Sequence, residues 1–280
     1  MFLWELNEAA KAVKTVTQKG LGLSLTKIKT FDMCEYKYFL QYILPKSKNP
    51  ENAEIQAKIK ADKADFNPDY FKKGQLAHKH IESALKGTVC DFKSTSLSDE
   101  DTKNTIDSCQ SVYDNEYINS IKHASKIEEP YALYITSEEE DGLTASSVYD
   151  KKADFSGYID FYAKIDDTIH VVDWKTGAAK TKKDDDTFMQ LFIYAKACQK
   201  LFGGSKFVLS YFYVNHGKIV TRELTVPELN GKLSAIVNKG ISIPSTDDPN
   251  DYKAKPDGCG YCPFSKVKNG AATCKFAVVK

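Results

Sequence analysis

Residues 155–175, FSGYIDFYAKIDDTIHVVDWK, contain two strand-like segments on either side of an Asp-Asp dipeptide at 166–167. Aromatic and β-branched residues dominate both segments, and two short polar residues between such segments are typical of a tight hairpin. We therefore expect Ile165 to pair with Thr168. This hairpin predicts the centre of a sheet and sets the register of every pair along it.

In this register Asp160 lies directly opposite Asp173, with Cβ atoms about 4.5–5.5 Å apart. Like charges at that distance repel, so we expect a hard divalent cation between them, with magnesium the leading candidate. Lys175 shares the face of Asp173, whereas His170 has the opposite parity and is expected to pack or lie at the surface. The alternative is a solvated strand face balanced by Lys175. The apolar neighbours of both aspartates favour the metal site, because a buried carboxylate without a partner is costly.

The composition is that of an ordinary globular protein, with 280 residues, 42% hydrophobic and 28% charged. We find no uncharged apolar stretch long enough to span a membrane and no signal peptide, so we expect a cytoplasmic protein without membrane contact. The net charge is +1, and among 39 basic residues Arg222 is the single arginine. Lysine contacts phosphates as a point charge, so any nucleic-acid binding is expected to lack base-specific readout.

Apolar periodicity and turn residues predict the order helix, three strands, helix, two strands, which is a mixed α/β core preceded by a helical part. The expected helices cover residues 24–44, 75–85, 99–125, 188–201 and 228–238, and residues 46–73 form a polar connection that is either helical or mobile. The expected strands begin at Tyr131 and continue at 155–165, 168–175, 206–214 and 218–226.

Five short motifs stand in a fixed order along the chain. They are Leu23–Leu44 with Cys34, GQLAH at 74–78, GYID at 157–160, DWKTG at 173–177 and QLFIY at 190–194. Together they resemble the N-terminal cysteine segment and the "GxxxH", "GxxD", "DxKTG" and "QxxxY" motifs of RecB-like PD-(D/E)XK nucleases. The resemblance implies a restriction-endonuclease-like α/β core, a mixed central sheet flanked by helices.

The resemblance also implies a role for each matching residue. Lys175 would position the attacking water and stabilise negative charge on the phosphate, and Gln190 and Tyr194 would hold the substrate strand or orient Lys175. Taken singly, a helix histidine, a surface glutamine and a core tyrosine have ordinary structural explanations, and only the order of the motifs argues against these. The implied ligands of a catalytic Mg²⁺ or Mn²⁺ are His78, Asp160, Asp173 and the backbone carbonyl of Trp174.

Three of the seven cysteines, Cys259, Cys262 and Cys274, lie near the C-terminal end. Their pattern resembles part of the iron–sulfur site in some RecB-like nucleases, including AddB and CRISPR-associated members, in which Cys34 would be the fourth ligand. A [4Fe-4S] cluster is favoured and zinc is the alternative. The sequence departs from the family pattern at two places. Eleven residues separate Cys262 from Cys274, where the family usually has fewer, and Glu35 follows Cys34 where the family usually has proline. The remaining cysteines are expected to be inert thiols: Cys90, Cys109 and Cys198.

The resemblance implies a single-stranded DNA exonuclease in recombination, repair or end processing, acting in the host cytoplasm if phage-encoded. DNA strands or ends are the expected partner, and a recombination or helicase protein is a candidate. The alternatives are a non-catalytic DNA-binding or assembly module and a protein whose cysteine site is purely structural. Two groups of residues have two explanations each. One group either binds the DNA backbone or belongs to a solvated loop: Lys180, Lys182 and Lys183. The other either stacks on bases or packs a helix against the core: Tyr36, Tyr38, Phe39 and Tyr42.

We expect three parts of the chain. Residues 1–73 form a helical segment that carries Cys34, residues 74–240 form the nuclease core, and residues 241–280 form a cysteine-rich metal-binding tail that packs on the N-terminal segment.

Overall fold

The computed structural model describes residues 22–61, 68–90, 96–136, 139, 141–265, 267–268 and 271–277. The chain divides into two compact units. One is built on Asn67–Asn238, and the other combines Leu23–Phe66 with Lys239–Lys280. No described helix is both long enough and apolar enough to cross a membrane.

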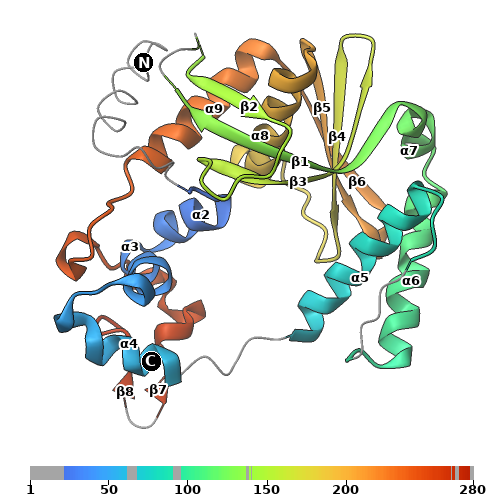
Figure 1. The fold of residues 1–280 in the computed structure, drawn as a ribbon. Coiled ribbons are helices and arrows are strands. Elements are labelled where there is room, and N and C mark those ends of the chain that lie inside the picture. The colour runs from blue at the N-terminus through green and yellow to red at the C-terminus, as the bar shows by residue number, and fades with distance from the viewer. Residues whose placement is uncertain are drawn as a thin grey trace. The chain divides into compact units, whose positions relative to one another are not determined.

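The first unit is organised around one mixed sheet, which within the described residues has six strands in the order β2-β1-β3-β4-β5-β6 (Figure 1). Among these described strands β4 and β5 run parallel, and the other neighbours are antiparallel. This mixed sheet with flanking helices confirms the predicted α/β fold. The strands are β1 (Ser125–Ile135), β2 (Leu143–Ser146), β3 (Phe155–Ile165), β4 (Thr168–Lys175), β5 (Lys206–Tyr213) and β6 (Lys218–Thr225).

The β3–β4 hairpin has the predicted register. Ile165 pairs with Thr168, and pairing continues as far as Phe161 with Val172. Asp166 in the turn has a φ of 52°, a left-handed conformation that aspartate tolerates better than most residues. The ladder stops one step before Asp160 and Asp173, so these two residues lie where the strands part and are not a hydrogen-bonded pair.

Helices cover both faces of this sheet. The helices α5 (Pro68–Leu85), α6 (Asp99–Tyr113) and α7 (Glu116–Ile121) share a buried core with the strand residues Phe161, Trp174 and Phe212. The helix α8 (Asp185–Phe202) packs on the residues of opposite parity, with the ring of Phe188 5.4 Å from that of Tyr211. The helix α9 (Val226–Ile241) follows β6.

Several predicted elements differ in their bounds. The helix expected over 99–125 is broken after Tyr113, because the side chain of Asn115 caps the new helix α7 by accepting a hydrogen bond from the Ile118 amide. The strand β1 begins at Ser125 instead of Tyr131, and α5 begins at Pro68 instead of 75. The short strand β2 was not predicted, so four strands, not three, precede α8.

The second unit has its own aromatic core. Tyr36, Tyr38 and Phe39 are buried there beside Tyr252, and Tyr42 is half-buried. The packing explanation is therefore correct for the first three rings.

The helices and strands of the second unit are short. They are α2 (Leu25–Met33), α3 (Glu35–Tyr38), the π-helix η1 (Phe39–Ile43), α4 (Ala53–Ala61), and the strands β7 (Val267–Lys268) and β8 (Ala271–Ala272). The 3₁₀ turns of this unit are η2 (Leu44–Lys46), η3 (Pro50–Asn52), η6 (Pro249–Asp251), η7 (Pro256–Tyr261) and η8 (Pro263–Ser265). In the first unit the 3₁₀ turns are η4 (Lys122–Ala124) and η5 (Val214–His216).

Candidate metal centre

A buried carboxylate lies at the end of β4. Asp173 is 1% exposed, and its Oδ2 atom lies 2.6 Å from Nζ of Lys175. This ion pair is the contact that the structure shows for Oδ2. One ammonium contact leaves further acceptor capacity on a buried carboxylate, which has two oxygens and about four lone-pair sites.

Asp160 and His78 lie next to this carboxylate and share the backbone of Trp174. The Trp174 amide donates a 2.9 Å hydrogen bond to Oδ2 of Asp160, and Nε2 of His78 donates to the Trp174 carbonyl at 2.9 Å. Nδ1 of His78 lies 3.5 Å from Oδ1 of Asp160. The helix α5 and the strands β3 and β4 thus bring together the predicted ligands His78, Asp160 and Trp174.

Glu128 is a member of this group that the sequence did not reveal. Ligand atoms of His78, Glu128 and Asp160 all lie within 4.8 Å of one another. Glu128 has a φ of 56°, and the β1–β3 ladder skips it between the pairs Ile127–Phe161 and Glu129–Ile159. Such a conformation costs of order 1–3 kcal/mol and is found most often at functional sites.

The prediction missed Glu128 because no motif marks it. Its position opposite Asp160 follows only from the pairing of β1 with β3, and the strand was expected to begin later, at Tyr131. An acidic residue two positions before a proline in an otherwise strand-like segment, as in Glu128-Glu129-Pro130, is the one local signal that could have suggested it.

Burial and mutual repulsion change the protonation of these groups. Burial is the main cause, and the negative charge of Asp160 the next, that raises the pKa of Glu128 to about 7. Burial also raises the pKa of Asp173 above its usual range, despite the opposing charge of Lys175. Burial alone would lower the pKa of His78, but the hydrogen bond and charge of Asp160 outweigh it and raise the pKa to about 9. The site therefore holds extra protons when no cation balances its carboxylates.

A chain of polar contacts extends from Lys175 to the helix α8. Nζ of Lys175 donates a 3.1 Å hydrogen bond to Oε1 of Gln190, and Nε2 of Gln190 donates at 2.6 Å to the hydroxyl of Tyr194. The Tyr194 ring packs edge-on against Tyr131 at 5.5 Å. A Cβ atom at Gly157 would lie 3.3 Å from the Tyr131 ring, which explains why a glycine suits this position of the GYID motif.

His170 lies away from this group, as its strand parity predicted. Nδ1 of His170 lies 3.0 Å from the hydroxyl of Tyr117, and the two rings are 5.8 Å apart. Burial lowers the pKa of His170, which keeps its imidazole neutral near pH 7. These contacts fit a packing role.

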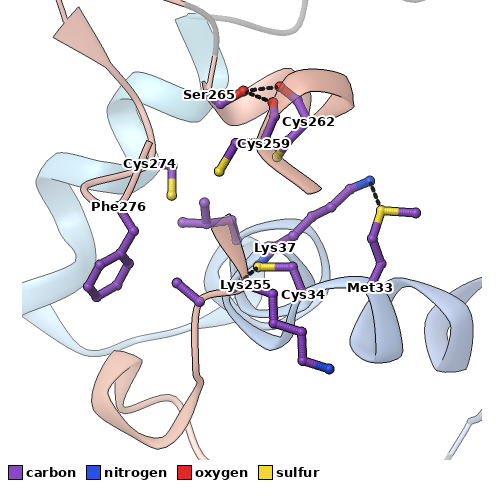
Figure 2. Close-up of a pocket in the computed structure, with 11 residues that line it drawn as sticks. Met33, Cys34, Lys37, Lys255, Cys259, Cys262, Ser265, Cys274 and Phe276 are labelled. Carbon is purple, nitrogen blue, oxygen red and sulfur yellow. Dashed lines mark hydrogen bonds between the residues drawn. The ribbon is translucent and has the colours of Figure 1, made fainter. Parts of the chain in front are cut away.

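A separate group of four cysteines lines a pocket in the second unit. Cys34 enters from the junction of α2 and α3, and Cys259, Cys262 and Cys274 come from the C-terminal segment. Figure 2 shows the four sulfur atoms turned toward the same space. The hydroxyl of Ser265 contacts the carbonyls of Cys259 and Cys262 and so holds that turn together.

Backbone amides in this pocket donate to the sulfur atoms. The amides of Lys37 and Lys255 each lie 3.4 Å from Sγ of Cys34. Burial is the larger influence on Cys262 and Cys274 and raises the pKa of both thiols, while backbone amides at residues 264, 265 and 276 act in the opposite direction. Amide donors stabilise thiolates, the form in which cysteine binds metals. Of the other cysteines, Cys109 and Cys198 are buried, and Cys90 is half-buried.

Comparison with known proteins identifies a family for this chain. The family model described as "PD-(D/E)XK nuclease superfamily" matches residues 22–267. Among solved structures, one described as "Crystal structure of SSO0001" is 16% identical, with a TM-score of 0.31, and the match covers 70% of this chain and 96% of that one. No curated protein matches the chain.

Proposed function

This chain belongs to the PD-(D/E)XK nuclease superfamily, and we propose that it is a Mg²⁺- or Mn²⁺-dependent deoxyribonuclease whose centre lies around Asp173. The observation that carries the proposal is the cluster of His78, Glu128 and Asp160, whose ligand atoms lie within 4.8 Å of one another, beside the buried Asp173. We further propose that the enzyme is a RecB-like exonuclease for single-stranded DNA, used in recombination, repair or end processing. The order of the five motifs supports this narrower assignment.

The residues at this centre suit a hard divalent cation. Mg²⁺ and Mn²⁺ prefer carboxylate and carbonyl oxygens, and Mn²⁺ also accepts imidazole. Side chains of Asp160, Asp173 and His78, with the carbonyl of Trp174, would hold the ion, and Glu128 would bind it directly or through water. When bound, such an ion neutralises phosphate charge and lowers the pKa of a coordinated water.

The protein's own residues would orient the substrate and supply charge at the scissile phosphate. Asp173 keeps Lys175 protonated, because the buried carboxylate outweighs the effect of burial and raises the pKa of Lys175. The ammonium group would stabilise negative charge that develops on the phosphate. The contact with Gln190, which Tyr194 holds in turn, fixes Lys175 on the α8 side. Of the two roles expected for Gln190 and Tyr194, this contact favours orienting Lys175.

Contact with DNA would be through the backbone. Arg222 is bound to Asp185 at 2.7 Å and also donates to the Lys183 carbonyl, so it is not free to read a guanine edge. Lys180 and Lys182 are exposed in the loop that follows β4, and we propose that they contact DNA phosphates. These features support binding without base-specific readout.

We also propose that Cys34, Cys259, Cys262 and Cys274 hold a [4Fe-4S] cluster, with Zn²⁺ as the alternative. Four sulfur ligands suit either group. The convergence of the sulfurs and the two amide donors to Cys34 support a metal–thiolate site. Because the ligands come from both segments of the second unit, the metal would join them and stabilise that unit.

The nuclease assignment is tested by incubating labelled single-stranded DNA with the full chain. We expect cleavage with Mg²⁺ or Mn²⁺ and none with a chelator. Asp173→Asn and Lys175→Ala should each slow cleavage by roughly 10²-fold or more, while the matched exposed control Asp107→Asn should not. A circular single strand should resist an exonuclease. Cleavage without metal, or wild-type rates in both centre variants, would contradict the proposal.

A further inference from the structure

An exposed pair of stacked tyrosines lies close to the metal centre. The rings of Tyr149 and Tyr158 are 5.6 Å apart with an interplanar angle of 15°, and the side chains are 39% and 49% exposed. Of the aromatic pairs among the described residues, this is the one in which both rings are exposed. Stacking covers one face of each ring, and the remaining surface of both side chains is partly accessible to a ligand.

The position of the pair follows from the strand β3. Tyr158 precedes Asp160 by two residues, so their Cα atoms lie about 7 Å apart along an extended strand. A base that stacks on Tyr158 would therefore belong to a nucleotide next to the phosphate at Asp160. Few other features of this strand segment are accessible, since Ile159 and Asp160 are buried.

The loop that carries Tyr149 is fixed by its own contacts. Asp150 accepts hydrogen bonds from the Tyr134 hydroxyl and from the Lys152 amide, both at 2.8 Å. At the end of the loop, Oδ2 of Asp154 accepts a 2.7 Å bond from the Ile135 amide. These bonds hold Tyr149 against Tyr158, so binding a base there would cost little ordering of the loop.

The charge next to the rings suits an anionic strand. Lys151 and Lys152 follow in the same loop and are exposed. A flat aromatic surface beside mobile cations is the combination by which proteins bind single-stranded nucleic acid without sequence preference, because every base has a π-face and every nucleotide a phosphate. Bases inside a duplex are stacked on both sides and do not offer their faces, so we take the occupant to be an unpaired base.

We propose that Tyr149 and Tyr158 form a stacking platform for an unpaired nucleobase of the DNA strand whose phosphate enters the metal centre. The proposal rests on the proposed nuclease function and adds to it a binding site for the unpaired base next to the phosphate at the centre. The platform would hold the strand while Lys151 and Lys152 contact its phosphates.

The test measures the binding of labelled oligothymidylate to the full chain by fluorescence anisotropy, with Ca²⁺ as the ion. Tyr158→Leu should weaken binding by roughly 5- to 150-fold, which corresponds to the usual 1–3 kcal/mol for one base–aromatic stack. Tyr149→Leu removes the ring that supports Tyr158 and should weaken binding by a smaller factor. Tyr158→Phe should bind like the wild type because it keeps the ring. The exposed neighbour Val148 supplies the matched control, Val148→Ala, which should change nothing.

A second arm separates stacking from a structural role. Replacing successive nucleotides with abasic residues should identify one position at which wild type and Tyr158→Leu bind equally weakly. Wild-type binding by both leucine variants would overturn the platform, as would an equal loss in Tyr158→Phe. If the wild type binds through the tyrosines but cleaves no DNA with Mg²⁺ or Mn²⁺, the nuclease function fails and the platform stands. If it cleaves and the leucine variants bind normally, only the platform fails.

Discussion

At the scale of single residues, the centre gathers more negative charge than its one lysine balances. Glu128, Asp160 and Asp173 lie around His78 and Lys175, and Asp160 and Asp173 are buried. Their repulsion is relieved either by protons or by a cation. Protons and a divalent ion should therefore compete for this site.

This competition predicts how stability depends on pH. The pKa of Glu128 rises to about 7 from 4.5 and that of His78 to about 9 from 6.5. Between these ordinary and raised values the folded protein binds more protons than the unfolded chain, so chelator-treated protein should lose stability as pH rises from about 5 to 9. Mn²⁺ should offset the loss, so its stabilising effect should be larger at pH 8.5 than at pH 6.

Thermal unfolding with and without Mn²⁺ across this pH range checks the prediction. Glu128→Gln removes one of the titrating groups and should flatten the pH dependence of the chelator-treated protein. A melting temperature that rises from pH 6 to 8.5 without metal would show that the folded-state pKa values are not raised. A Mn²⁺ effect that shrinks over the same interval would argue against proton displacement.

The sequence predicted some of these residues and missed one for a physical reason. Asp160 and Asp173 follow from a two-residue hairpin whose register is local, and His170 follows from the parity of the same strand. Glu128 depends on pairing between β1 and β3, about thirty residues apart, and on a positive φ that no residue pattern near it requires. Non-local pairing and backbone strain are the features that a single sequence conveys least.

At the scale of elements, the connection from α8 to β5 depends on two glycines. Gly203 and Gly204 have φ values of 72° and 114°, and the amides of Ser205 and Lys206 donate to the Asp167 carbonyl in the β3–β4 turn. A Cβ atom at Gly204 would lie 2.9 Å from a side-chain carbon of Ile169. The turn thus fixes where the parallel strand β5 joins β4.

Gly204→Ala should therefore destabilise the first unit. The strained φ and the contact with Ile169 together should cost about 2 kcal/mol or more, which lowers the melting temperature by roughly 4–8 °C in a unit of this size. Gly231 is the matched control, because it lies within α9 and an added Cβ there would meet open space, so Gly231→Ala should stabilise by roughly 0.5–1 kcal/mol. Equal melting temperatures for Gly204→Ala and wild type would remove the strain argument.

Element bounds were predictable where a cap or turn lies in the local sequence. Ser24 caps α2 by accepting from the Lys27 amide, in agreement with the helix start expected there. Asp184 caps α8 by accepting from the Thr187 amide, so this helix begins at Asp185, three residues before the expected start at 188. The break before α7 was missed because Asn115 sits inside a continuous helical pattern, and the short β2 was missed because its four residues pair only with β1. Short elements take their stability from neighbours, which a periodicity argument does not include.

At the scale of the whole molecule, the chain leaves one compact unit and returns to it. The segments Leu23–Phe66 and Lys239–Lys280 form the second unit on either side of the sheet-bearing unit in the sequence. Ion pairs and hydrogen bonds join these segments, including Lys239 with Asp32 at 2.7 Å and Ser47 with Asp247 at 2.7 Å. The cysteine site, if it holds a metal, would add the strongest link between them.

We expect full-length protein purified without oxygen to be brown and to contain iron. Cys34→Ser should remove the iron and increase hydrogen exchange in residues 25–46 and 253–262, with little change in the sheet. Cys90→Ser is the matched control, because Cys90 lies in the other unit and should leave the metal content unchanged. Colourless protein with stoichiometric zinc would show that zinc, and not an iron–sulfur cluster, is bound by the same four cysteines. Protein that contains no metal would contradict the proposal that these cysteines form a metal site.

The central claim is that His78, Asp160, Asp173 and the Trp174 carbonyl form one divalent-ion site. Anomalous scattering from crystals of the full chain soaked in Mn²⁺ tests this most directly. We predict a peak about 2.0–2.4 Å from these four ligand groups, and its loss in Asp173→Asn crystals treated in the same way. A peak at other carboxylates only, or none here at saturating Mn²⁺, would contradict the claim.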